Sequence, residues 1–142
     1  MKLFYFEPDN TPLIFTYYDY VPENQVPNFF YAANALLLPY NSNYKGSSGP
    51  LMKGACTFGL PVVVSDVSEM GRLAKKYELG FVSKPADAVS LEYAMNSFLS
   101  ASDEERSKIQ KNAFDLGARN SWPEMARKYE AVFYSLNNKD IA

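Results

Sequence analysis

The sequence predicts an α/β domain in which a mostly parallel sheet lies between helices on both faces. Two short runs, Ala35–Leu38 and Val62–Val64, are uninterruptedly apolar, which is typical of strands buried on both faces. Segments with helical spacing of apolar residues lie between and after these runs, and strands alternating with helices indicate a parallel sheet. With 142 residues the chain has the size of one domain, so we assign residues 1–142 to a single three-layer domain.

The first third of the chain predicts extended segments followed by one helix. Aromatic and β-branched residues fill Leu3–Phe6 and Leu13–Tyr18, on either side of the turn-rich segment Pro8–Pro12. Apolar residues then recur at helical spacing from Val26 to Ala33. Pro27 stands in the first turn of that helix, where its missing N–H costs little.

The middle of the chain predicts a helix, a second buried strand, a short helix and a third strand. A polar loop, Asn41–Gly49, precedes a helical stretch over Pro50–Phe58, and Gly59 is the expected stop signal. After the valine run, Met70–Tyr77 predicts a short helix and Gly80–Ser83 predicts a strand.

The C-terminal third predicts three helices. Apolar residues form one stripe at helical spacing: Leu91, Ala94, Met95, Phe98 and Leu99. Ser102 with Glu105, and again Ser121 with Glu124, have the spacing of a capping box. We therefore expect helices to begin after Ser102 and after Ser121, the second being a closing helix within residues 121–142.

The composition excludes several classes of function. The chain has one cysteine and no histidine, which excludes an internal disulfide, a Cys/His zinc site and a Ser-His or Cys-His nucleophile. We therefore expect neither a metal site nor a bound cofactor. The net charge is −2 and no lysine or arginine cluster forms a stripe, so we expect no nucleic-acid partner.

Targeting signals are not expected either. No stretch reaches the roughly 20 apolar residues that cross a bilayer, and the short apolar run at the N-terminus meets Glu7 and Asp9 at once. The run is therefore no signal peptide, and the expected location is cytoplasmic.

One loop predicts an anion site. Gly46, Ser47, Ser48 and Gly49 lead directly into Pro50, the expected first residue of a helix. Small residues let a ligand approach the backbone, and a helix N-terminus offers unpaired N–H groups with a partial positive charge, which suits a phosphate. The alternative is that Ser48 or Gly49 only caps the helix.

Several motifs follow one another in an order that resembles the glycosyl transferases group 1 family. They are Tyr20-Val21-Pro22, Asn28 to Asn34, Leu37-Leu38-Pro39-Tyr40, Ser47 to Leu51, Phe58 to Asp66, Gly80-Phe81-Val82, and Trp122-Pro123-Glu124 with Lys128-Tyr129. The resemblance covers roughly Leu13 to Leu136, and Phe58 to Asp66 is its most specific piece. It implies the Rossmann-like C-terminal, donor-binding half of a retaining GT-B glycosyltransferase, a hexosyltransferase-like enzyme, with a nucleotide-sugar as donor substrate.

The resemblance also implies a set of donor-binding residues. Backbone amides of Ser47 to Leu51 would contact the donor phosphates. The family's two glutamates, one near the sugar and one on the ribose, fall on Gly46 and Gly54. The full set is Gly46, Ser47, Ser48, Gly49, Leu51, Lys53, Gly54 and Glu69, with Lys53 alternatively a solvated lysine and Glu69 a carboxylate near the sugar. No catalytic residue is assigned.

The chain departs from the family pattern in length as well. Met1–Pro12 is an atypical start that replaces the family's additional strand and helix with their basic pair, and the acceptor-binding domain is absent from the sequence. We therefore expect a truncated donor domain that is incomplete alone, acting in polysaccharide biosynthesis with an acceptor-domain partner. The alternative is a non-catalytic remnant or interaction module that keeps the GT-B fold and self-associates. An unrelated phospho-receiver is disfavoured because no acidic cluster follows the first strand.

Overall fold

The computed structural model describes residues 19–137 of the chain. The expected extended runs Leu3–Phe6 and Leu13–Tyr18 lie outside the described residues. The chain divides after Tyr31 into two compact units, which are treated separately below.

The first unit contains the helix that the spacing from Val26 to Ala33 predicts. Helix α1 spans Val26–Ala32, with Pro27 in its first turn. A tight turn precedes it, in which the N–H groups of Gln25 and Val26 donate to Pro22 O at 2.8 and 3.2 Å. The helix prediction is confirmed, with an end one residue earlier than expected.

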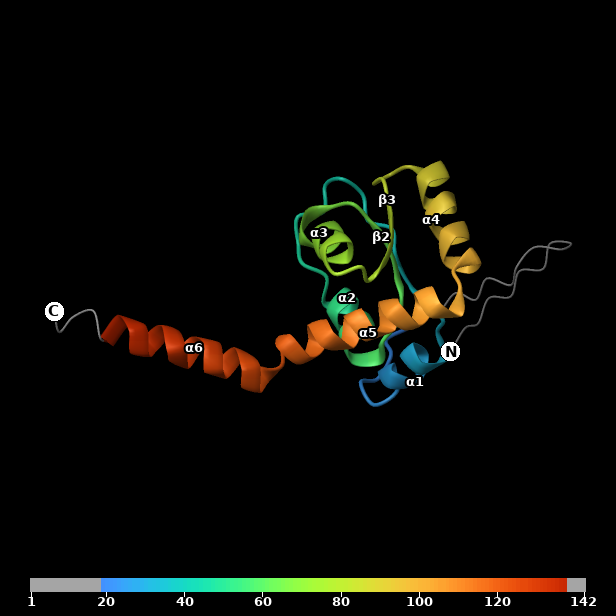
Figure 1. The fold of residues 1–142 in the computed structure, drawn as a ribbon. Coiled ribbons are helices and arrows are strands. Elements are labelled where there is room, and N and C mark those ends of the chain that lie inside the picture. The colour runs from blue at the N-terminus through green and yellow to red at the C-terminus, as the bar shows by residue number, and fades with distance from the viewer. Residues whose placement is uncertain (1–18, 138–142) are drawn as a thin grey trace, which may run out of the picture. The chain divides into compact units, whose positions relative to one another are not determined.

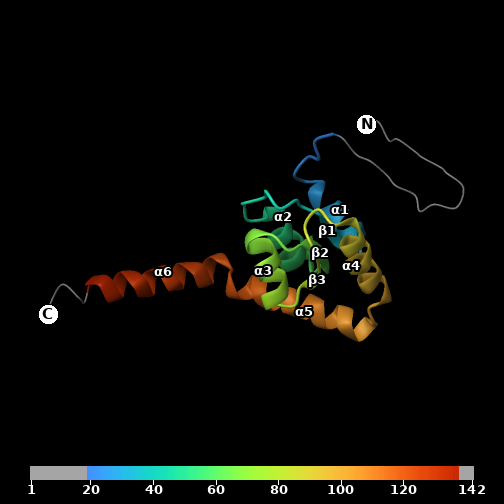
Figure 2. The same ribbon diagram turned by 90° about the horizontal axis from the view of Figure 1, so that it is seen from above.

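The second unit is built on a three-stranded parallel sheet (Figures 1 and 2). Its strands are β1 (Leu36–Leu38), β2 (Val62–Ser65) and β3 (Gly80–Ser83), in the order β1-β2-β3. The register pairs Leu38 with Val64 across β1 and β2, and Ser65 with Ser83 across β2 and β3. The carboxyl ends of all three strands therefore lie at one edge, where ligands bind in sheets of this kind.

Six further helical segments follow within the part of the chain that the structure describes. They are α2 (Gly49–Leu51), η1 (Met52–Thr57), α3 (Ser68–Lys76), α4 (Ala88–Ser100), α5 (Asp103–Arg119) and α6 (Trp122–Asn137). Figures 1 and 2 both show the sheet between α3 and α4. The expected α/β fold with a parallel sheet and helices on both faces is confirmed.

The core joins the sheet to α2, η1, α3 and α5, which all contribute buried residues to it. Every residue of β2 is buried, as the uninterrupted valine run predicts. The buried core residues are Leu38, Leu51, Ala55, Val62, Val64, Val67, Met70, Ala74, Leu79, Ala113 and Leu116.

Two glycines are required where elements meet. Gly80 has a φ of +150°, and a Cβ there would lie 2.0 Å from Val62 O, so β3 approaches β2 as closely as it does only because residue 80 has no side chain. Gly59 ends the preceding helix with a φ of +68°, as its sequence position predicts, and a Cβ there would lie 2.7 Å from the ring of Phe114.

Strand β1 departs from the expectation of burial on both faces. Leu38 is buried, but the Leu37 side chain is 43% exposed and Leu36 is only partly buried. Within residues 19–137 β1 pairs with β2 alone. It is therefore an edge strand of the sheet, and its side chains are less completely covered than those of the central strand β2. An apolar run by itself does not distinguish an edge strand from a central one.

The stripe predicted for α4 is also only partly buried. Ala94 is buried and Phe98 packs edge-to-face on Phe81, with ring centroids 6.3 Å apart. Met95 and Leu99 are exposed, Leu99 by 66%. The helix that the stripe predicts forms, and it contacts the sheet along a narrower line than its apolar content indicates.

The predicted helix over Pro50–Phe58 forms, but most of it is not α-helical. After the single α-turn of α2, residues Met52–Thr57 form a π-helix. Gly54 lies inside this wide turn, and Gly117 of α5 lies against it, where a Cβ would be 2.8 Å from Cys56 O. Hydrophobic periodicity does not separate α from π geometry over so few residues, and π turns often occur at functional sites.

Candidate functional site

The loop that follows β1 runs into the helix start that the sequence predicts. Ser48 is the N-cap of α2, with extended backbone angles, and its Oγ accepts a hydrogen bond from Leu51 N at 3.2 Å. Pro50 occupies the first turn. Ser48 is one of three buried polar residues within residues 19–137, and its hydroxyl oxygen caps the helix.

Capping by Ser48 leaves backbone donors of the loop unused. Within residues 19–137 the N–H groups of Ser47, Ser48 and Gly49 have no hydrogen-bond acceptor. A Cβ placed on Gly49 would have no atom within 4 Å, so the space above this backbone is open. Free N–H groups at a helix start that carries partial positive charge are the elements of an anion site.

Two tyrosines hold the loop in place. The rings of Tyr40 and Tyr44 stack with centroids 4.2 Å apart and an interplanar angle of 22°. Tyr44 Oη donates to Ser47 O at 2.8 Å. This side-chain bond closes the loop on itself and fixes the residue that begins the row of free N–H groups.

Gly46 lies under the same tyrosine. A Cβ at position 46 would stand 3.1 Å from Tyr44 Oη and 3.2 Å from Tyr44 Cζ. The end of the Tyr44 side chain therefore lies close to residue 46 and would have to shift slightly to admit a side chain there.

The remaining predicted residues of the helix differ in accessibility. Leu51 is 1% exposed and belongs to the core, so only its backbone could face a ligand. Gly54 is buried within η1, and Gly54 O accepts from Leu60 N at 3.1 Å. Lys53 is exposed, in agreement with the alternative that it is a solvated lysine.

Glu69 lies at the neighbouring strand end, in the first turn of α3. Its carboxylate is held in a two-point ion pair by Arg72, with Arg72 Nε donating to Glu69 Oε2 at 2.6 Å. The hydrogen bond from Arg72 holds the pKa of the Glu69 carboxyl below its ordinary value. Glu69 is thus an exposed, ionised and already paired carboxylate.

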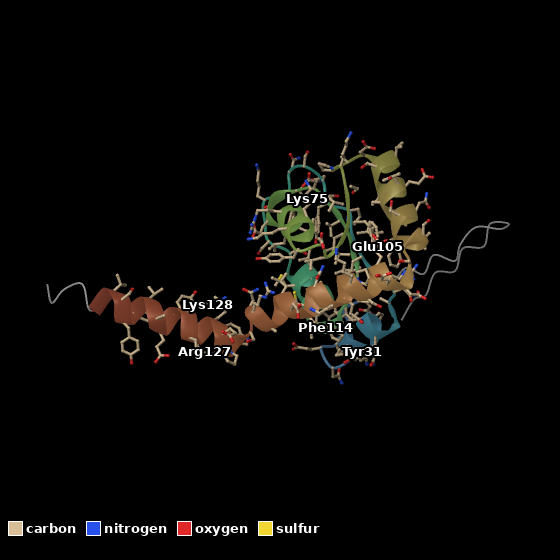
Figure 3. All side chains as sticks on the ribbon, in the orientation of Figure 1. Tyr31, Lys75, Glu105, Phe114, Arg127 and Lys128 are labelled. Carbon is tan, nitrogen blue, oxygen red and sulfur yellow. The ribbon has the colours of Figure 1, made fainter. Side chains whose placement is uncertain are left out.

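Asp66, at the end of β2, is paired in the same way. Lys75 Nζ lies 2.5 Å from Asp66 Oδ2, and Figure 3 labels Lys75 on α3. Ser68, the first residue of α3, has a φ of +48°, a left-handed conformation that costs energy for a residue other than glycine. The Asp66–Lys75 pair links the end of β2 to α3 across this connection, and the Glu69–Arg72 pair lies within α3.

Two serines at the same edge of the sheet were not predicted. Ser65 and Ser83 end β2 and β3, lie opposite each other in the register and are each 2% exposed. They line a hollow of about 250 Å³ together with Lys84, Asp87 and Leu91. The available signal was that each serine is the first polar residue after an apolar strand.

The chemistry of this edge is that of binding rather than of proton transfer. It offers backbone N–H donors, serine hydroxyls and carboxylates that are already ion-paired. Among the described residues no group of three or more His, Cys, Asp or Glu side chains could hold a metal ion. The arrangement suits a diphosphate whose charge is met by backbone amides.

Comparison with known proteins identifies one family. Residues 14–115 match the family model described as Glycosyl transferases group 1, and this match includes β1, β2, β3 and the loop after β1. A search of curated proteins finds none that matches the chain. No helix described between residues 19 and 137 is long and apolar enough to cross a membrane.

Proposed function

This chain belongs to the glycosyl transferases group 1 family, and on that premise we propose that it is a donor-binding domain of a glycosyltransferase. The ligand is a nucleotide-sugar, whose diphosphate lies against the backbone of Ser47, Ser48 and Gly49. The single observation that carries the proposal is the row of unused N–H groups in this loop, next to a glycine with open space above it.

In this proposal the loop recognises the negative charge of the ligand. A diphosphate carries negative charge that free N–H groups and a helix N-terminus stabilise without a basic side chain. The side-chain bond from Tyr44 Oη to Ser47 O keeps the loop from collapsing onto its own donors. The loop is therefore preorganised before the ligand arrives.

In the proposed reaction the bond between the sugar and the diphosphate breaks, and an acceptor oxygen forms the new bond to the sugar. The nucleoside diphosphate leaves with the added negative charge. The N–H groups of the loop stabilise that charge. An acceptor-binding partner supplies the other half of the site in this proposal, because no residue described here is assigned to activate the acceptor.

Three further parts of the proposal rest on family membership. The nucleotide-sugar is a substrate, and no resident cofactor is invoked. The pathway is assembly of a polysaccharide, and the location is the cytoplasm. Identification of the acceptor would test these three parts of the proposal.

A specific observation favours a second candidate, a domain that keeps the fold without the transfer chemistry. The ring of Tyr44 fills the space beside Gly46, and Gly54 is buried in η1. A side chain at residue 46 would require a small shift of the end of the Tyr44 ring, and one at residue 54 would have to be accommodated inside η1. Under this candidate the loop binds no nucleotide.

Titration calorimetry of the purified chain with UDP, GDP and ADP separates the two candidates. We expect one of the three to bind. Gly49→Phe should weaken that binding at least about tenfold, because the ring would occupy the open space above the loop and keep the diphosphate from the N–H groups, and a lost hydrogen bond to a charged group is worth about 1.5–3 kcal/mol. Ser47→Asp, which adds a like charge at the exposed start of the loop, should weaken it as well.

The matched controls are Thr57→Phe and Thr57→Asp, at the exposed far end of η1. They should leave both the affinity and the melting temperature near those of the unchanged chain. If none of the three nucleotides binds at millimolar concentration, the donor-site proposal is wrong and the fold-only candidate remains.

A further inference from the structure

Helix α6 carries a continuous apolar stripe that is exposed. At 100° per residue, seven of its apolar side chains fall within about 120° of the helix circumference, centred on Tyr129, while Tyr134 and Ala131 lie outside this arc. The stripe, called here the α6 stripe, consists of Trp122, Met125, Ala126, Tyr129, Val132, Phe133 and Leu136. Trp122 is 89% exposed, Tyr129 60% and Phe133 65%. A monomeric protein rarely leaves such a stripe open.

The spacing within the α6 stripe specifies the kind of partner. Trp122, Met125, Tyr129, Val132 and Leu136 follow one another at intervals of three, four, three and four residues. This alternation is the seam along which one helix packs against another with the same repeat. This spacing of apolar residues is typical of helix–helix packing and not of packing on a flat sheet or around a small ligand. The stripe therefore fits a helix as its partner.

The area of the stripe is sufficient for a stable pairing. An aromatic side chain carries roughly 150–250 Å² of surface, so the exposed fractions leave on the order of 700 Å² of apolar surface on each chain. A specific interface buries about 600–1,000 Å² per partner. Two copies of the stripe therefore meet this requirement when they face each other.

We propose that the α6 stripe is a dimerisation surface and that its occupant is the α6 stripe of a second copy of this chain. A two-fold pair needs one patch that is complementary to itself. The stripe meets this condition because Tyr129 lies at its centre and a large apolar residue lies at each end. The inference does not depend on the proposed donor site.

The flanks of α6 are consistent with a seam that excludes charge. The charged residues of α6 lie outside the stripe, where Arg127 pairs with Glu124 at 2.7 Å and Lys128 Nζ donates to Arg119 O at 2.9 Å. Figure 3 labels Arg127 and Lys128 on this helix. Burial of the α6 stripe against a partner thus removes apolar side chains from water without burying an unpaired charge.

The test uses the full chain in sedimentation equilibrium from low micromolar to near-millimolar concentration. We expect a monomer–dimer equilibrium, with Tyr129→Glu raising the dissociation constant at least about tenfold because a charge would be buried in the apolar seam. Val132→Glu should act likewise. Ala131→Glu, which makes the same change on the opposite side of α6, should leave the constant within about threefold of the unchanged chain, as for a solvated surface site.

Circular dichroism of each variant checks that α6 and the sheet are intact. Three outcomes would overturn the proposal. The unchanged chain could remain monomeric throughout the range, in which case another protein covers the stripe. Dimers of Tyr129→Glu and Val132→Glu as tight as those of the unchanged chain would place the interface elsewhere. Equal weakening by Ala131→Glu would attribute the effect to helix stability rather than to the stripe.

Discussion

Tyr44 and Ser47 are joined by a hydrogen bond from Tyr44 Oη to Ser47 O, 2.8 Å long, and this bond closes the loop that carries the free backbone donors. Removal of the hydroxyl in Tyr44→Phe keeps the stack on Tyr40 and deletes only the bond. Since such a bond contributes about 0.5–1.5 kcal/mol, we expect nucleotide affinity to fall by roughly two- to tenfold.

The matched control is Tyr40→Phe, because the Tyr40 hydroxyl makes no side-chain hydrogen bond within the described residues. Calorimetry on both variants gives the comparison. Equal affinities in the two variants would mean that the loop keeps its shape without the Tyr44 bond.

The Ser48 side chain is expected to contribute mainly to the stability of the folded chain. Its Oγ caps α2 by accepting from Leu51 N, and loss of a serine N-cap typically costs about 1 kcal/mol. Ser48→Ala should therefore lower the free energy of unfolding by about that amount in urea titrations. Ser47→Ala, at the exposed neighbouring position, should leave it nearly unchanged. If the two variants unfold at the same urea concentration, the cap is not a stabilising contact.

The sequence predicts those parts of the fold that local chemistry determines. The valine run of β2 is buried as expected, because a strand without polar residues has no face for solvent. Ser102 Oγ accepts from Glu105 N at 3.2 Å, so the start of α5 is where the capping pattern predicts it. The helix start after the loop that follows β1 could be located for the same reason, since small residues before a helix-starting proline are a local signal.

Other parts depend on tertiary contacts that the sequence does not display. The exposure of Leu99 and Leu37 reflects which neighbours cover them, and an apolar pattern cannot reveal that. Ser65 and Ser83 are brought together only by the register of β2 and β3. The commitment of Ser48 to a cap likewise becomes visible only when the geometry of its hydroxyl is known.

Gly80 is expected to be the least replaceable glycine of the sheet. In Gly80→Ala the new methyl would lie 2.0 Å from Val62 O and 2.6 Å from Val62 N, at a φ of +150°. Both are backbone atoms of the central strand and cannot rotate away. The expected loss exceeds about 4 kcal/mol, most of the stability of a small domain.

Gly49→Ala is the matched comparison, because no atom lies within 4 Å of a Cβ at position 49. Thermal unfolding followed by circular dichroism should place this variant within a few degrees of the unchanged chain, and Gly80→Ala should lack a cooperative transition. A cooperative transition for Gly80→Ala near that of Gly49→Ala would contradict the close approach of β3 to β2.

Glu78 and Lys108 predict a pH dependence of stability. Lys108 Nζ lies 2.8 Å from Glu78 Oε2, and this hydrogen bond holds the pKa of the Glu78 carboxyl below its ordinary value of 4.5. The folded chain therefore keeps Glu78 ionised at a pH where the unfolded chain already binds a proton. The resulting contribution to stability is complete above the ordinary value and is lost as the pH falls through the folded pKa.

In Lys108→Met the Glu78 pKa should rise toward 4.5, and NMR titration of the Glu78 side chain measures this. The difference in unfolding free energy between the unchanged chain and the variant should shrink as the pH falls below that value, and added salt should shrink it too, since both side chains are exposed. The control is Lys53→Met, because Lys53 forms no ion pair within residues 19–137. A Glu78 pKa that stays depressed in Lys108→Met would attribute the shift to another neighbour, of which Asn112 is the first to test.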